Sequence, residues 1–349
     1  MSEAQKYVWE GAIPLQIHLH ESEVTTLPPP PPALVLAPRI GYLPLLISLL
    51  KPHFSSTLPP GQDTIWFEYK GLPLKWYIPT GVLFDLLCVE PERPWNPTVH
   101  FRGYPSNLLL PCEGEDSVKR SFINSLKEAA YVINGNCKNV MNMSQPDQVE
   151  LWGSVLNGNL ESYRRVSSKL KLGTFEDKHT ENINSVLPKS ESTGDTDAAG
   201  QVKSGRIPVR LYVWTVNEEF DDFEDAPQVD DWDKVSYTNR PVEIHNEDGK
   251  FFSLNDAVRR LLPEFFQGSS FDNEGDTNIN RTTEEGENSG DPGSSFDAHE
   301  IAEIKLVRIQ GIEPILEIPF SWVVNNLMNP EYFLHMCVCL KISEASAVQ

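Results

Sequence analysis

Apolar residues occupy every second position over short stretches in both halves of the chain, which is typical of half-buried β-strands. Ile13, Leu15, Ile17 and Leu19 show the alternation most clearly. In the first half, the pattern predicts strands at 13–19, 34–36, 65–69, 74–78 and 98–102. In the second half, it predicts strands at 207–215, 241–245, 301–309, 314–318 and 332–340.

Short helices are expected between these strands. The first covers 42–50, with Pro44 in its first turn and Pro52 closing it, because proline is tolerated at a helix start but not inside. The others cover 80–88, 254–266 and 320–327, and Ser253 is the expected N-cap of the helix at 254–266. Each half then has the order ββαββαβ, which is the order of a β-grasp, or ubiquitin-like, fold.

The two halves also share one sequence pattern. The stretch GLPLKWYIPTGVLFDLL at 71–87 returns in outline as GIEPILEIPFSWVVNNL at 311–327. Each copy contains a turn glycine, an apolar segment with an inner proline, an Ile-Pro pair and a short apolar helix. A repeated unit of this kind predicts two domains of one fold within an α+β protein.

The segment between the two halves has the 3.6-residue periodicity of amphipathic helices. One apolar face runs from Val118 to Ile133, and a second, longer stripe runs from Val149 to Leu170. The predicted organisation is a ubiquitin-like domain at 1–103, a helix-rich domain at 114–172, a flexible linker at 173–204 and a second ubiquitin-like domain at 205–343.

The net charge of -21 is local rather than spread over the chain. Two acidic insertions in the second domain, at 216–235 and 268–300, together carry eighteen acidic and two basic residues. The insertion at 268–300 has the composition of a disordered segment. No basic patch interleaved with aromatic residues is present, so nucleic-acid binding is not expected.

Candidate metal-binding residues are sparse. His18 and His20 are expected to share a strand face, but a third ligand is missing, so a solvated face is favoured and neither a metal nor a cofactor is predicted. Cys337 and Cys339 are interpreted as buried core thiols. Scattered cysteines without a zinc spacing fit a cytosolic protein with reduced thiols.

Enzymatic motifs and membrane spans are not found in the sequence either. No Ser/His/Asp order, glycine-rich phosphate loop or HExxH motif is present, and no apolar run is long enough to span a bilayer. Trp152 and Trp322 are expected to be core or interdomain anchors. The chain ends SEASAVQ without the diglycine of a conjugated modifier, so an acceptor is expected rather than a donor.

Six stretches of the sequence resemble the autophagy-related protein 5 family. They are VWEGAIP (8–14), LAPRIGYLPLL (36–46), IWFEYKGLPLKWYIPTGVLFDLL (65–87), PWNPTVHF (94–101), LKEA (126–129) and IQGIEPILEIPFSWVVNNL (309–327). They follow both ubiquitin-like units and the helical region in order, and 65–87 is the most specific of them. The two acidic insertions and the long linker resemble the plant form of the family.

The resemblance implies a scaffold that is not itself an enzyme. Lys127 would be the acceptor of an isopeptide bond to the C-terminal glycine of the ubiquitin-like autophagy-related protein 12. Helical periodicity places Lys127 roughly 140° from the centre of the apolar face, so an exposed side chain is expected. The family also implies that the N-terminal helix of the coiled-coil autophagy-related protein 16 binds in a groove between domains.

Such a complex would act like a ligase. It would promote transfer of autophagy-related protein 8 to phosphatidylethanolamine on the forming autophagosome membrane, while the catalytic cysteine would belong to the conjugating enzyme. The expected location is the cytoplasm, with recruitment to the phagophore membrane through the complex. The alternative is a β-grasp adaptor that binds partner helices without being conjugated. A reduction-resistant band, heavier by about one ubiquitin-like domain, would distinguish the two.

Overall fold

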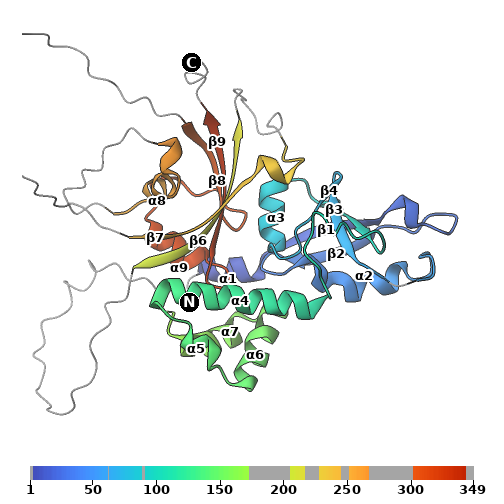
Figure 1. The fold of residues 1–349 in the computed structure, drawn as a ribbon, viewed down its shortest axis with the longest axis horizontal. Coiled ribbons are helices and arrows are strands. Elements are labelled where there is room, and N and C mark those ends of the chain that lie inside the picture. The colour runs from blue at the N-terminus through green and yellow to red at the C-terminus, as the bar shows by residue number, and fades with distance from the viewer. Residues whose placement is uncertain are drawn as a thin grey trace, which may run out of the picture.

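The computed structural model describes residues 3–61, 63–88, 91–172, 205–216, 228–244, 251–266 and 302–342. Two sheets and a group of helices lie side by side (Figure 1). The predicted linker at 173–204 and the insertion at 268–300 lie outside the described residues. Of the insertion at 216–235, the structure describes residue 216 and residues 228–235.

The first domain contains a five-stranded sheet in the order β2-β1-β5-β3-β4. Its strands are β1 (Ala12–Leu19), β2 (Ala33–Pro38), β3 (Trp66–Tyr69), β4 (Leu72–Pro73) and β5 (Thr98–His100). β1 runs parallel to β5, and the other pairs are antiparallel. The helices are α1 (Glu3–Glu10), α2 (Ile47–Phe54) and α3 (Thr80–Leu87), and a 3₁₀-helix at Leu43–Leu46 leads into α2. From β1 onward the order is the predicted ββαββαβ.

The second domain repeats the central parallel pair of strands. Its sheet has the order β7-β6-β9-β8, and β6 runs parallel to β9. The strands are β6 (Arg206–Val216), β7 (Ser236–Glu243), β8 (Ala302–Arg308) and β9 (Leu334–Ile342). The helices are α8 (Leu254–Leu261) and α9 (Phe320–Leu327). The duplication predicted from the sequence is therefore present as two ubiquitin-like sheets.

The helical region consists of α4 (Glu115–Asn134), α5 (Lys138–Met141), α6 (Gln145–Leu156) and α7 (Leu160–Ser167), followed by a 3₁₀-helix at Ser168–Leu170. The apolar stripe predicted from Val149 to Leu170 is divided between α6 and α7. Gly158, with φ +62°, turns the chain after α6, and the Asn159 side chain caps the start of α7. A left-handed glycine followed by an N-cap residue separates the two helices.

Two predicted strands, at 74–78 and 314–318, are wrong in the same way. In the first copy the pairing with β3 covers Leu72 and Pro73 and ends with the Leu74 N–H, which donates to the Phe67 carbonyl at 2.8 Å. The Ile78 N–H then donates to the Lys75 carbonyl at 3.0 Å. In the second copy the Ile318 N–H donates to the Ile315 carbonyl at 3.1 Å. Each apolar segment therefore forms a turn that leads into the following helix, and the second domain has the order ββαβαβ.

Other predicted boundaries also shift. Pro52 does not close its helix, since α2 continues to Phe54. The proline is tolerated there because the carbonyl that it leaves unpaired belongs to Ser48, which is exposed and can bind water. The helix at 254–266 ends at Leu261, since Pro263 starts a short 3₁₀-helix. The strand expected at 241–245 begins earlier, as β7. Ser253 is the N-cap predicted, with a capping box to Asp256.

The two copies share one turn conformation. Lys70 and Gly71 have φ of 51° and 83°, and Gln310 and Gly311 have φ of 54° and 76°. Two successive positive φ values are those of a type I′ turn, which glycine adopts without strain. A Cβ atom at Gly311 would also lie 2.7 Å from the Arg39 guanidinium, so a side chain at this position would displace a residue of the first domain.

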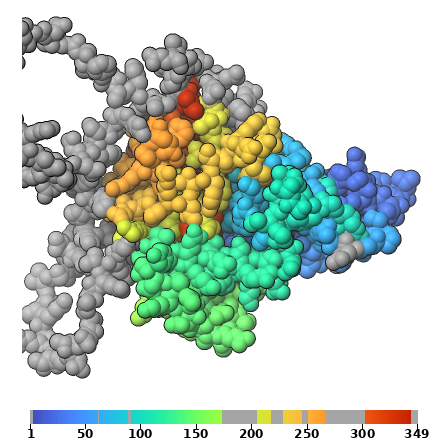
Figure 2. All heavy atoms as spheres, in the orientation of Figure 1, coloured from blue at the N-terminus to red at the C-terminus, as the bar shows by residue number. Residues whose placement is uncertain are grey.

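Two apolar cores cross the domain boundaries, and β6 contributes to both. One core joins the helical region to the second domain and includes Ile207, Val209, Leu211 and Val213. The other joins the first sheet to the opposite face of the second sheet and includes Tyr212, Trp214 and Val216. Burial on both faces explains the nearly continuous apolar sequence of β6. Figure 2 shows the first domain (blue to cyan), the helical region (green) and the second domain (yellow to red) in contact along these boundaries.

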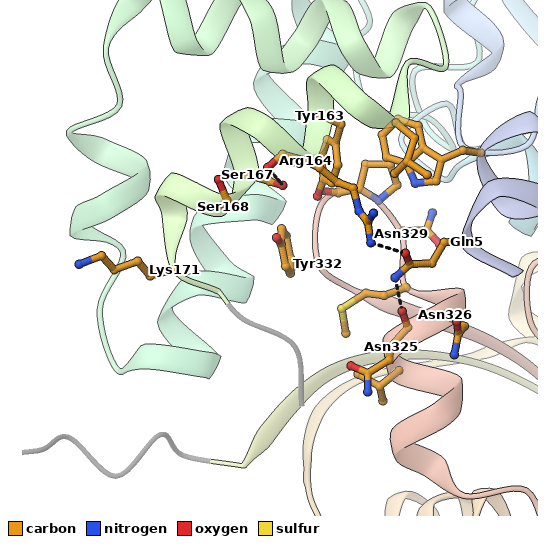
Figure 3. Close-up of a pocket in the computed structure, with 15 residues that line it drawn as sticks. Gln5, Tyr163, Arg164, Ser167, Ser168, Lys171, Asn325, Asn326, Asn329 and Tyr332 are labelled. Atoms are coloured by element: carbon orange, nitrogen blue, oxygen red, sulfur yellow. Dashed lines mark hydrogen bonds between the residues drawn. The ribbon is translucent and has the colours of Figure 1, made fainter. Parts of the chain in front are cut away.

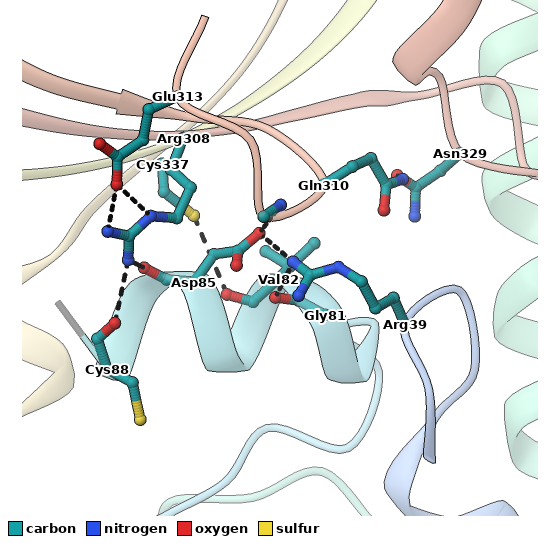
Figure 4. A network of polar contacts seen from close by, with 11 residues as sticks. Arg39, Gly81, Val82, Asp85, Cys88, Arg308, Gln310, Glu313, Asn329 and Cys337 are labelled. Carbon is teal, nitrogen blue, oxygen red and sulfur yellow. Dashed lines mark hydrogen bonds and ion pairs between the residues drawn. The ribbon is translucent and has the colours of Figure 1, made fainter. Parts of the chain in front are cut away.

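A buried polar network fixes α3 against the second domain (Figure 4). The Asp85 carboxylate pairs with Arg39 and accepts the Gly311 N–H at 2.8 Å. Arg308 donates to the carbonyls of Asp85 at 3.3 Å and Cys88 at 2.9 Å. These contacts join residues from the two ubiquitin-like domains, so the domains are held by directional bonds as well as by apolar packing.

Candidate functional site

Lys127 lies in the middle of α4, which is the longest described helix. The predicted apolar face of α4 is confirmed, because Val118, Phe122, Leu126, Ala129 and Ile133 are all buried. Gly114 and Gly135 flank the two ends of the helix. Two acidic residues lie in its first turn, where their negative charge interacts favourably with the positive end of the helix dipole. The Lys127 side chain is partly buried rather than fully exposed, so the expectation of an exposed lysine is wrong in degree.

The turn of α4 that carries Lys127 is tied to the second domain. The Arg210 guanidinium of β6 donates to the Ser125 hydroxyl at 3.1 Å and to the Glu128 carboxylate at 2.9 Å. Asn239 of β7 donates to the other Glu128 oxygen at 2.8 Å. The guanidinium carbon of Arg210 also lies 3.7 Å from the centre of the Phe333 ring. Lys127 is therefore presented by a helix with a fixed position.

An open depression of about 430 Å³ lies beside this helix. Its helical wall is polar, with serines, Asn124, Arg120 and Glu128, while Trp76 and Pro111 form the facing wall. The Trp76 indole N–H donates to the Leu110 carbonyl at 2.8 Å, which fixes the ring at the rim. Asn124, Ser125 and Glu128, on the turn of α4 that carries Lys127, thus form a continuous surface with Trp76 of the first domain.

A second hollow, of about 410 Å³, lies where all three parts of the chain meet (Figure 3). α1 supplies Gln5 and Trp9, α7 supplies Tyr163 and Arg164, and the segment after α9 supplies Tyr332. We call this hollow the three-part groove. No local sequence pattern indicated it, because its residues come from three distant stretches of the chain.

Hydrogen bonds across the three-part groove fix its walls. The Arg164 guanidinium donates to the Gln5 amide oxygen at 2.7 Å, and the Gln5 amide N–H donates to the Asn325 carbonyl at 2.5 Å. The Tyr163 hydroxyl donates to the Pro330 carbonyl at 2.6 Å. Burial raises the pKa of Tyr163 and of Tyr332, so both phenols stay neutral at physiological pH. The groove therefore has rigid aromatic walls with a cationic guanidinium at its rim.

The described end of the first acidic insertion packs against the first domain. Val229 is buried, and the Trp232 indole N–H donates to the Pro73 carbonyl at 2.8 Å. The Lys75 ammonium lies 4.3 Å from the centre of the Trp232 ring, which is within cation–π range. This part of the insertion is an ordered contact between the domains, which its acidic composition did not indicate.

The remaining sequence predictions have mixed outcomes. His18 and His20 lie on the same outer face of the first sheet, as predicted, because the N–H groups of both donate to β5-side carbonyls, those of Pro97 and Val99, at 3.1 Å. The buried Leu19 between them points to the other face. Cys337 and Cys339 are buried as predicted. Burial raises the pKa of Cys337, and it raises that of Cys339 to about 12, so neither thiol is a ready nucleophile at neutral pH.

The two tryptophans differ. Trp152 is buried in the core and donates to the Glu115 carboxylate at 2.8 Å, which confirms its role as an anchor. Trp322 is 41% exposed, so its assignment as an anchor is wrong. It lies on the outer side of α9, where no other described element covers it fully. Among the described helices, none has the length and apolarity that a bilayer span requires.

Two ubiquitin-like folds around a helical bundle, with a groove between all three, define a protein built on paired ubiquitin-like domains. Family models identify it further. The model "Autophagy protein ATG5, UblA domain" matches residues 8–101, the alpha-helical bundle region of the same protein matches 115–173, and its UblB domain matches 206–338. The chain belongs to the autophagy protein 5 family.

Similar proteins agree with this assignment. Autophagy protein 5 of Arabidopsis thaliana is 63% identical over 340 residues, which cover 97% of this chain and 98% of that protein. Autophagy protein 5 of Oryza sativa subsp. indica is 54% identical over 97% of this chain and 93% of its own length. The crystal structure of Kluyveromyces marxianus Atg5 superposes with a TM-score of 0.62 and 22% identity, over 97% of this chain and 99% of the yeast one, which shows the same fold. The chain is a plant-like member of the family, with a role in autophagy.

Proposed function

We propose that the chain is a non-catalytic scaffold joined through Lys127 to the ubiquitin-like autophagy-related protein 12. The Lys127 amine would attack the thioester that links the glycine carbonyl of this modifier to the conjugating enzyme. A C–N bond forms, the C–S bond breaks, and the enzyme's thiol leaves. The observation that supports this role best is the placement of Lys127 on a helix turn held by Arg210, because aminolysis needs an amine in a fixed position.

We further propose that the three-part groove binds the N-terminal helix of the coiled-coil autophagy-related protein 16. Its aromatic walls suit the apolar face of an amphipathic helix, and Arg164 at the rim suits an acidic side chain next to that face. The groove contains residues from all three parts of the chain, so an occupied groove would also reinforce their arrangement. Bound in this way, the partner would contribute its coiled coil to a larger assembly.

The resulting complex would act like a ligase for autophagy-related protein 8. It would promote transfer of that protein to phosphatidylethanolamine, with the catalytic cysteine in the conjugating enzyme of that system. The complex would form in the cytoplasm and be recruited to the phagophore membrane, so membrane contact would be peripheral. This supports assembly of the autophagosome without catalytic chemistry in the chain itself.

An immunoblot of the full chain in cell extract tests the covalent step. Lys127→Arg should remove the heavier, reduction-resistant band, because guanidinium keeps the charge but is a poor nucleophile. Lys119→Arg, on the same helix, is the matched control and should keep the band. Persistence of the adduct in Lys127→Arg would refute the acceptor assignment. If the wild-type chain gives no adduct, the non-covalent adaptor remains as the function.

A charge reversal tests the groove independently. Arg164→Glu should weaken capture of the partner helix, since it places a negative charge at the rim and breaks the bond to Gln5. The neighbouring Arg165→Glu is the control, because Arg165 is also exposed but pairs with Glu150 outside the groove. Equal loss of binding in both variants would show that general charge, rather than the groove, determines the affinity.

A further inference from the structure

Three polar side chains lie together on the outer face of the first sheet, where β1, β5 and β3 end side by side. The register pairs Trp66 with His100 and Glu68 with Thr98, so Glu68 is a diagonal neighbour of His100. On the other side of β5, Leu19 pairs with Val99 and the His20 N–H donates to the Val99 carbonyl at 3.1 Å. Adjacent strands therefore place His20, Glu68 and His100 in one row.

His100 is the centre of this row and is only 6% exposed. The Trp66 ring stacks on one side of it, with ring centroids 3.8 Å apart and planes at 8°, and the His20 ring stacks at 4.3 Å. The His100 Nε2 atom is buried, and it has no hydrogen-bond partner within the described ranges. It lies 3.3 Å from a Glu68 carboxylate oxygen. A buried ring nitrogen without a hydrogen bond is unfavourable unless a ligand satisfies it.

A buried carboxylate, that of Glu23, lies on the other side of the His100 ring. Glu23 is 5% exposed and accepts the backbone N–H groups of Phe101 at 2.8 Å and Arg102 at 3.2 Å. One of its oxygens lies 3.6 Å from His100 Nδ1. With a cation bound between His100 and Glu68, the Nε2 lone pair would coordinate it, and the Nδ1 proton would face Glu23. Metal-binding histidines have the same arrangement of an outer carboxylate behind the ring.

We propose that His20, Glu68 and His100 bind a divalent transition-metal cation of the zinc type. One potential ligand atom from each lies within 4.8 Å of the others. Two imidazoles and one carboxylate are a set that suits zinc, with water as the fourth ligand, whereas magnesium and calcium prefer oxygen ligands. His20 Nδ1 lies 2.7 Å from the Ser22 hydroxyl, so its Nε2 atom is the nitrogen left for the cation.

An occupied site would connect the turn after β1 to the ends of β3 and β5. The cation would satisfy the buried Nε2 atom and balance the charge of Glu68. The simpler interpretation is an aromatic stack that closes the sheet face without any ligand. The two interpretations differ in one measurable property, because only the first predicts a specific response to zinc that depends on His20 and Glu68.

The full chain, first treated with a chelator and then dialysed, provides the test. Zinc chloride should raise its unfolding midpoint, because a ligand of the folded state stabilises that state. Magnesium chloride should not. His20→Ala and Glu68→Gln should each weaken zinc affinity by roughly tenfold or more. His18→Ala is the matched control, since His18 is exposed two residues earlier on the same strand and should leave the zinc response unchanged.

Cobalt substitution adds a readout that a purely structural role would not change. The cobalt-loaded wild-type chain and His18→Ala should show visible absorption bands of tetrahedral coordination, and these should be lost in His20→Ala and Glu68→Gln. Both variants change side chains that are not fully buried, so the fold is expected to persist and can be checked by unfolding without metal. A wild-type chain that does not respond to zinc, or an equal response in all variants, would overturn the proposal.

Discussion

Replacing Asp85 with alanine should destabilise the protein strongly, because Asp85 is a buried acceptor between the two ubiquitin-like domains. Asp85 is 2% exposed, and its carboxylate pairs with Arg39 and accepts the Gly311 N–H. Alanine would leave the guanidinium of Arg39, a residue that is 8% exposed, without a counter-charge and the Gly311 amide unpaired. Removing one partner of a buried pair costs about 3–5 kcal/mol. This is a large share of the roughly 5–15 kcal/mol that stabilises a protein of ordinary size.

The pair should be strongly coupled rather than simply favourable. Burial raises the pKa of Asp85, and the neighbouring Arg39 only partly offsets this effect, so the charged carboxylate is held at a cost. Arg39→Met combined with Asp85→Leu removes both charges together. The double variant should therefore lose less stability than the sum of the two single losses, because neither leaves an isolated buried charge.

Urea unfolding followed by tryptophan fluorescence measures all members of this cycle. The coupling free energy should lie within about 0.5–3 kcal/mol, the usual range for residues in direct contact. Glu264→Ala, at an exposed position, provides the control and should change stability by no more than about 0.5 kcal/mol. Additive single losses, or a loss in Asp85→Ala as small as in the control, would refute the assignment of Asp85 as an interdomain anchor.

Three further predictions follow from burial, charge and composition. Phe320→Ala should cost about 3–5 kcal/mol of stability because Phe320 is fully buried. Trp322→Ala, at a position that is 41% exposed, should cost less than about 2 kcal/mol. Equal shifts of the two thermal midpoints would contradict this difference. Lys51, and to a smaller extent Arg102, lowers the pKa of Asp63 from its ordinary 3.8. The stability that Asp63 contributes is therefore fully present above pH 3.8, the pKa of the unfolded state, and is lost as the pH falls through the lower pKa of the folded state. Asp63→Asn should consequently flatten the decline of stability below about pH 4, and an unchanged acid limb in pH-dependent unfolding would argue against it. Deleting 270–298 should leave unfolding of the second domain cooperative, since the segment is acidic and nearly free of apolar residues, and calorimetry that shows a broadened transition would contradict the prediction.

Local signals predicted the elements whose ends are decided locally. The helix at 320–327 has the predicted bounds because an Ile-Pro pair precedes it, and Ser253 was identifiable as an N-cap from its own side chain. The segments at 74–78 and 314–318 failed for a different reason. Alternating apolar residues need a partner strand to form a ladder, and in both copies the chain turns away after the hairpin instead. Pairing is a tertiary property, so periodicity could not exclude it.

The candidate sites show the same limit more strongly. A family resemblance indicated Lys127, and the periodicity predicted its helix. The sequence did not predict which side of that helix the first and second domains cover. The three-part groove and the row of His20, Glu68 and His100 combine residues that lie far apart in the sequence. No third candidate lies near His20 in the sequence, because Glu68 and His100 come from the neighbouring strands β3 and β5. Only the sheet register places them together.

The duplicated helices show why equivalent sequence positions need not have equivalent burial. Trp322 of α9 corresponds to Val82 of α3, yet Val82 is 6% exposed and Trp322 is 41% exposed. All eight residues of α3 are buried, because this helix lies between its own sheet and β9, and the Cys337 thiol contacts the Val82 carbonyl at 3.9 Å. α9 instead contacts α1 through Gln5 and keeps its outer side open beside the three-part groove. The first copy thus uses its helix to join the two ubiquitin-like domains. The second copy's helix instead lines the three-part groove.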